Sequence, residues 1–197
     1  IPMALMDFVP VIFFGITAVL LLRDLYNKMF KGAYALLAAG SVNVFLAGFC
    51  KALWKLLYAA NICDFVALEE MFMPVNSLGL LFVGLSLIGM LCWKNKSVVL
   101  SAAPPVFASS MPFIMMMVVG LGGLCAGLSV LAAKMKKGTV MILFILSFVC
   151  ASQDSTQAWV NWAEQSINTV SQLCLMLGVI ALHKAGLKDW TWEETAA

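Results

Sequence analysis

Two sets of polar side chains stand out in a largely apolar sequence, and each set follows helical spacing. The first is Glu69, Asn76 and Ser77, which share one helical face because positions seven and eight residues on return to the same side. The second set follows at i, i+4, i+7 and i+8: Glu164, Asn168, Ser171 and Gln172. Carboxylates at one end of such a stripe can gather a cation or hydrogen-bond a polar solute, and deeper amides and hydroxyls can replace its hydration. The pattern predicts a path lined by these substrate-binding residues: Glu69, Asn76, Ser77, Glu164, Asn168 and Gln172.

A simpler interpretation of the same residues is helix–helix association. Asn, Ser and Gln side chains join membrane helices through interhelical hydrogen bonds worth about 0.6 kcal/mol each on average. One such residue alone would fit this structural role better. Two stripes with matching order favour the binding path.

Two lysines lie one turn apart near the outer end of the second apolar segment. Lys51 is expected to pair with Asp154, which would lower the cost of removing each charge from water and could form an outer gate. Lys55 is expected instead to extend its ammonium group to the outer membrane interface, beside a belt of tryptophans.

The composition indicates the solvent in which these residues work. Of 197 residues, 63% belong to the AVILMFWYC class and 11% are charged, whereas soluble domains have about 45–50% apolar and about 25% charged residues. Much of the surface must therefore face lipid, which excludes soluble enzymes, nucleic-acid-binding proteins and disordered chains. A single histidine and six scattered cysteines without a C-x-x-C pair provide no zinc or redox motif, so we expect no metal and no cofactor.

Apolar stretches of about 20 residues mark helices that span a membrane. Five stretches are clear: 5–22, 33–57, 71–93, 139–158 and 165–183. Residues 98–133 are ambiguous, because they are too many for one helix and barely enough for two.

Positive charge helps to resolve this ambiguity, because short cytoplasmic loops accumulate Lys and Arg. Basic residues form four clusters: Arg23/Lys28/Lys31, Lys94/Lys96, Lys134/Lys136/Lys137 and Lys184/Lys188. All four can be cytoplasmic only if 98–133 crosses twice. This predicts seven spans in the cell membrane, with the N-terminus outside and the C-terminus in the cytoplasm. The alternative is six spans with 98–110 re-entrant or lying in the interface.

An internal repeat supports the odd number of spans. The basic loop at 28–32 (Lys-Met-Phe-Lys-Gly) recurs at 134–138 (Lys-Met-Lys-Lys-Gly), and further along Glu69 aligns with Glu164. Two three-helix units of the same orientation need one crossing between them. We therefore expect an all-α, polytopic integral membrane protein in a 3+1+3 arrangement. Its parts would be a first repeat at 1–93, a linker helix at 94–115, and a second repeat with a short cytoplasmic tail at 116–197.

This layout is similar to that of SWEET-type sugar transporters and other PQ-loop proteins. The chain contains no Pro-Gln dipeptide, so the resemblance implies topology only and no functional residue is carried over.

The expected function is a small transporter or channel for a polar or cationic solute, not an enzyme. The alternative is a non-transporting membrane sensor or a substrate-binding subunit of a larger complex. An intramembrane lipid-modifying enzyme is less favoured, because the sequence has no D-x-x-D or similar compact ligand motif. The expected partners are the lipid bilayer, the solute, and a second copy of the chain or another membrane subunit, without nucleic acid.

Overall fold

The computed structural model describes residues 2–92, 111–151 and 160–190, and every regular element in these ranges is an α-helix. The helices are α1 (Pro2–Met6), α2 (Phe8–Leu25), α3 (Lys31–Ala59), α4 (Val66–Glu70), α5 (Phe72–Cys92), α6 (Met111–Lys134), α7 (Gly138–Ala151) and α8 (Val160–Lys184). Five segments of this part are long and apolar enough to cross a membrane: Ala4–Leu25, Lys31–Ala59, Val66–Cys92, Met111–Lys134 and Gln165–Lys184. The prediction of an all-helical chain compatible with a membrane is therefore confirmed.

The ambiguous stretch 98–133 is only partly described. Helix α6 runs without a break from Met111 to Lys134, so residues 111–115, expected in the linker helix, form its first turns. The remainder of that linker lies outside the described residues. The seven-span arrangement and its six-span alternative both stay predictions.

Two prolines explain the two interruptions within the apolar segments. Helices α1 and α2 meet at Asp7, three residues before Pro10, and α4 and α5 meet at Met71, three residues before Pro74. Proline has no N–H to donate to the carbonyl four residues earlier, and its ring crowds that carbonyl. In both cases that carbonyl belongs to the last residue of the preceding short helix. The first break leaves Asp7 at the N-terminal end of α2.

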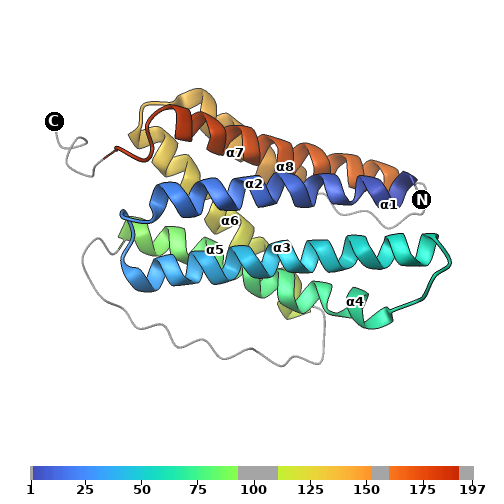
Figure 1. The fold of residues 1–197 in the computed structure, drawn as a ribbon. Helices are drawn as coiled ribbons and strands as arrows, with labels where there is room; N and C mark the ends of the chain where they lie inside the picture. The colour runs from blue at the N-terminus through green and yellow to red at the C-terminus, as the bar shows by residue number, and fades with distance from the viewer. Residues whose placement is uncertain (1, 93–110, 152–159, 191–197) are drawn as a thin grey trace.

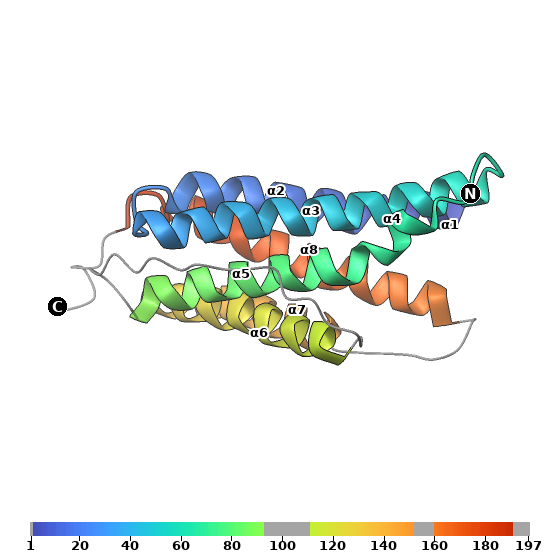
Figure 2. The ribbon, with the colours of Figure 1, turned by 90° about the horizontal axis from the view of Figure 1, so that it is seen from below.

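The six long helices form a closed ring. Helix α2 packs on α3 and α8, α3 on α5, α5 on α6, α6 on α7, and α7 on α8. Figure 2 shows three layers of two helices, with α2 and α3 in one, α5 and α8 in the middle, and α6 and α7 in the third. The turns and helix ends that carry Lys28, Lys31, Lys134 and Lys184 gather at one end of this bundle, on the left in Figure 1. We call this the basic end.

Helices α5 and α6 are consecutive among the described helices, yet they run in the same direction. Asn76 contacts Met117 near the start of both helices, and Gly127 lies against Leu87 near their ends. Helices α2 and α8 also run in the same direction, with Asp24 and His183 paired near their ends. Both α5 and α6 end at the basic end, so α6 begins at the opposite end. Cys92, the last residue of α5, and Met111, the first of α6, therefore lie toward opposite ends of the bundle (Figure 1).

Glycines bring α5 and α6 into backbone contact. A Cβ atom on Gly84 would lie 2.4 Å from the carbonyl oxygen of Gly120, and one on Gly120 would lie 2.3 Å from the carbonyl carbon of Leu80. Gly123 likewise lies against Gly84, so small residues allow these two helices to pack closely. Gly122 differs, because it faces the Phe148 ring of α7 at ordinary contact distance.

The interior between these helices is apolar and tightly filled. Its fully buried side chains come from every long helix and include Leu25, Leu37, Leu87, Leu128, Phe144, Leu175 and Val179. The two charge pairs described below therefore lie at opposite ends of an apolar core.

A hydroxyl pair joins α7 to α8 within this core. Ser171 Oγ donates to the carbonyl oxygen of Ser147 at 2.8 Å, and the two hydroxyl oxygens lie 3.3 Å apart. We expect Ser171→Ala to lower the free energy of unfolding by about 1 kcal/mol, because it removes a buried interhelical hydrogen bond. Ser86 is a matched control, since its buried hydroxyl donates only to Val83 of its own helix. Chemical unfolding in detergent should show little change for Ser86→Ala, and equal losses for the two variants would contradict this role.

Candidate functional site

A buried ion pair lies at the end of the bundle opposite the basic end. Asp7 occupies the N-cap position of α2, but its side chain does not cap the helix. Its Oδ2 atom lies 2.6 Å from Lys55 Nζ on α3, and the two side chains are 7% and 32% exposed respectively. Lys55 therefore has a carboxylate partner that the sequence did not predict, because the proline-induced break presents Asp7 within its reach. Its location at the membrane interface stays a prediction.

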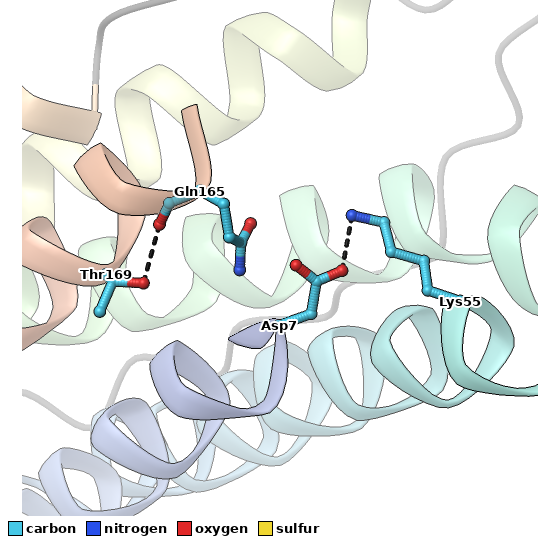
Figure 3. Close-up of polar contacts among 4 residues, drawn as sticks. All are labelled: Asp7, Lys55, Gln165 and Thr169. Carbon is cyan, nitrogen blue, oxygen red and sulfur yellow. Dashed lines mark hydrogen bonds and ion pairs between the residues drawn. The ribbon is translucent and has the colours of Figure 1, made fainter. Parts of the chain in front are cut away.

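Helix α8 contributes polar groups to the same place. Figure 3 shows the side-chain amide of Gln165 pointing toward Asp7. One turn further along, the Thr169 hydroxyl donates to the Gln165 carbonyl oxygen at 2.7 Å. Asp7 Oδ1 is buried and has no hydrogen-bond partner among the described residues. An unsatisfied buried carboxyl oxygen is costly, so this atom retains unused acceptor capacity.

Deeper polar groups belong to two other parts of the bundle. Asn76 is 8% exposed and donates its amide to Met117 Sδ at 3.4 Å. Ser77 is fully buried and donates to the Pro74 carbonyl oxygen of its own helix at 3.2 Å. On α8, Gln172 Oε1 is buried without a hydrogen-bond partner in the described part of the chain. Asn76 thus serves the α5–α6 contact, while Gln172 retains an unused acceptor.

The remaining predicted binding residues do not gather with these groups. Glu69 lies on α4 and is exposed, and Asn168 is exposed on α8. Glu164 belongs to α8, but its side chain lies outside the described residues. The structure does not bring Asn76 and Asn168 together, because Asn76 packs against α6 and Asn168 is exposed on α8.

The predicted gate is described at only one of its two residues. Lys51 Nζ lies 4.0 Å from the centroid of the Phe72 ring, a cation–π contact between α3 and α5. Asp154 lies outside the described residues. Pairing of Lys51 with Asp154 stays a prediction.

A second buried acidic group lies at the basic end. Asp24 Oδ2 is 2.7 Å from His183 Nδ1 on α8, and the Asp24 side chain is 0% exposed while that of His183 is 30% exposed. Asp24 Oδ1 is buried and has no hydrogen-bond partner within the described ranges. Neither residue of this pair was predicted from the sequence.

The spacing along α2 is a signal that would have identified both carboxylates. The buried face of α2 follows a seven-residue pattern with three- and four-residue steps: Asp7, Pro10, Phe14, Thr17, Leu21 and Asp24. Such spacing keeps residues on one helical face. An acidic residue at each end of a buried apolar seam is expensive to desolvate and marks a functional candidate.

The two halves of the chain differ at these positions. In the register that aligns residues 28–32 with 134–138, Asp7 corresponds to Phe113 and Asp24 to Val130. The same register places Phe14 where the second half has Gly120. Both carboxylates therefore lie along α2, where Asp7 pairs with α3 and Asp24 with α8, while glycines bring α5 and α6 into contact.

The described residues contain no group of three or more His, Cys, Asp or Glu side chains that could hold a metal ion. Their polar groups instead suit hydrogen bonding and charge pairing with an organic solute or a monovalent cation. The chain matches no protein-family model, no curated protein and no solved structure.

Proposed function

We propose that the protein is a membrane carrier for a small polar or cationic solute. The observation that carries this proposal is the pair of buried acid–base contacts at opposite ends of one membrane-length helix, Asp7 with Lys55 and Asp24 with His183. A carrier must offer its solute polar partners at both faces of the membrane while apolar packing closes the path between them. Here Phe14 and Leu21 occupy the same face of α2 between the two carboxylates.

We further propose the 3+1+3 arrangement, with α2, α3 and α5 as one repeat and α6, α7 and α8 as the other. The helix contacts support it, because a half-turn rotation of the ring superposes α2, α3 and α5 on α6, α7 and α8, and every helix keeps equivalent neighbours. The parallel contact of α2 with α8 then corresponds to that of α6 with α5, and the α2–α3 and α3–α5 contacts correspond to α6–α7 and α7–α8. Because α5 and α6 are parallel, Cys92 and Met111 lie toward opposite ends of the bundle, which accords with one additional crossing.

In this carrier the Asp7–Lys55 pair is the outer contact. A solute ammonium or hydroxyl group donates to Asp7 Oδ1, which has no other hydrogen-bond partner among the described residues. A cationic group also competes with Lys55 for the carboxylate and loosens the α2–α3 contact. The solute then meets Gln165 and Gln172 along α8 before it reaches the Asp24–His183 pair at the other end.

The charge distribution supports one orientation in the cell membrane. The basic end faces the cytoplasm, because positively charged residues accumulate there. The N-terminus is then outside and the C-terminus is inside. In a variant whose native cysteines are replaced by alanine, because Cys63 is exposed at the outer end, a single cysteine introduced at position 27 should react with an impermeant maleimide only after the cytoplasmic side is opened. Labelling of this variant in intact cells would overturn the orientation.

Uptake into proteoliposomes tests the function. We expect the wild-type protein to accumulate at least one solute from a panel of amines, cations, amino acids and sugars. Asp7→Asn should reduce uptake by about tenfold, because charge-assisted hydrogen bonds are worth about 1.5–3 kcal/mol. Glu70→Gln is the matched control, since Glu70 is an exposed carboxylate at the same end. Equal uptake by the wild type and Asp7→Asn would contradict the role of Asp7.

A substrate-binding membrane subunit is the second candidate. The observation that favours it is the tight apolar packing between the two charge pairs, which suits capture at one face without passage. Ligand-induced thermal stabilisation without uptake of any solute would support this alternative.

A further inference from the structure

An open pocket of about 430 Å³ lies at the basic end, beside Asp24. It is formed by the last turn of α2, the first turn of α3 and the segment that follows α8. Its lining residues are Leu22, Arg23, Asp24, Tyr26, Asn27, Tyr34 and Lys188. This volume falls within the range of small-molecule sites.

The pocket has defined walls on both sides. The rings of Tyr26 and Tyr34 meet edge to face at 5.1 Å between centroids, which fixes the end of α2 against the start of α3. On the other side, Leu187 and Trp190 are buried and anchor the segment that carries Lys188. Lys28 also donates to the Trp190 carbonyl oxygen. Lys188 is therefore attached to a fixed segment even though its own side chain is exposed.

The lining carries one acidic and two basic residues, and part of this charge has no partner among the described residues. Asp24 is buried with one oxygen directed at His183 and the other, Oδ1, without a hydrogen-bond partner among the described residues. Arg23 and Lys188 are exposed and form no ion pair in the described part of the chain. An anion alone would leave Asp24 Oδ1 unsatisfied, and a cation alone would leave both basic groups facing an open pocket.

We propose that this pocket binds a small zwitterion, with the ammonium group donating to Asp24 Oδ1 and the anionic group held between Arg23 and Lys188. Asn27 and Tyr34 add an amide and a hydroxyl for the rest of the solute. The same chemistry is present in a free amino acid and in an ethanolamine phospholipid headgroup. The inference rests on the proposed function only in taking the free zwitterion to be the transported solute at its release site.

Calorimetric titration of the purified full-length protein in detergent tests the pocket without transport. We expect glycine or 4-aminobutyrate to bind, while ethylamine and acetate bind at least about tenfold more weakly, because each presents only one of the two charges. Arg23→Gln and Asp24→Asn should each weaken binding by about tenfold or more. Lys184→Gln is the matched control, because Lys184 is an exposed cation at the same end that does not line the pocket.

Arg23 keeps the test decisive if Asp24→Asn fails to fold, because Arg23 is exposed and its loss leaves the core intact. Binding of ethylamine or acetate as tightly as the zwitterions, or unchanged binding in Arg23→Gln, would overturn the proposal. Native mass spectrometry in nanodiscs containing phosphatidylethanolamine and phosphatidylglycerol distinguishes the two sources. Selective retention of phosphatidylethanolamine that Arg23→Gln abolishes would assign the pocket to the headgroup.

The same measurements separate this inference from the carrier proposal. Zwitterion binding without uptake into proteoliposomes would sustain the pocket and reject the carrier. Uptake of some other solute by a protein that binds no zwitterion would sustain the carrier and reject the pocket.

Discussion

Gly120→Ala is expected to destabilise the protein more than any other methyl addition in α6. The added carbon would lie 2.3 Å from the Leu80 carbonyl carbon and 2.4 Å from the Leu81 nitrogen. These are backbone atoms of α5, which cannot rotate away, so the two helices must separate. Overpacking of this kind costs about 1–3 kcal/mol and occasionally more, and we expect about 3 kcal/mol here. Chemical unfolding in detergent, followed by circular dichroism, measures the loss.

Gly122→Ala provides a control in the same helix. A carbon there would lie 3.6 Å from the Phe148 ring, which is an ordinary contact. We expect its stability to equal that of the wild type or to rise by a few tenths of a kcal/mol, because alanine favours helix more than glycine does. If Gly120→Ala and Gly122→Ala are equally stable, α5 and α6 are not in backbone contact at this position.

Lys55→Met is expected to cost about 3 kcal/mol of unfolding free energy. Removing one member of a buried ion pair costs about 3–5 kcal/mol, because the remaining charge is left without compensation. Asp7 is the deeply buried member, at 7% side-chain exposure, and it has no other ion-pair partner in the described ranges. The partial exposure of Lys55 places the expected cost at the low end of the range.

The reverse substitution should cost less. In Asp7→Asn the lysine that remains is 32% exposed, so its ammonium group can extend to water along its flexible stem. We expect a loss of about 1 kcal/mol for Asp7→Asn, and the double variant Asp7→Asn/Lys55→Met should resemble it rather than Lys55→Met. Additive losses in this double-mutant cycle would show that the two side chains are not coupled.

The sequence predicts the helices of this protein better than their facing surfaces. Apolar length alone locates four of the five clear segments to within about five residues, since a membrane helix must satisfy its backbone hydrogen bonds internally. The fifth, 139–158, is described only as far as α7 (Gly138–Ala151). It does not indicate which side of each helix is buried, because lipid and protein interiors are similarly apolar. Asn168 and Ser171 illustrate this: both lie on α8 within one turn, but Asn168 is exposed and Ser171 is bonded to α7.

The position of the candidate site depends on contacts between helices that the sequence does not show. Helix spacing predicts a polar stripe along α8, but it could not show that Gln165 points toward Asp7 (Figure 3). The contact of Asp7 with Lys55 joins positions on different helices, and it depends on a local break at Pro10 as well as on tertiary packing. The sequence does not single out Asp24, because it lies beside Arg23 in a basic cluster. An acidic residue next to such a cluster is typical of a surface charge.

The unequal contacts between the two halves also bear on how such a chain could have evolved. If each half derives from one ancestral unit, a symmetric homodimer of that unit would have had identical contacts on both sides. Two copies of residues 2–92 could no longer make that dimer, because Phe14 would take the place of Gly120 opposite Gly84. On this hypothesis, separately expressed halves should assemble as a heterodimer, and neither half should replace its partner.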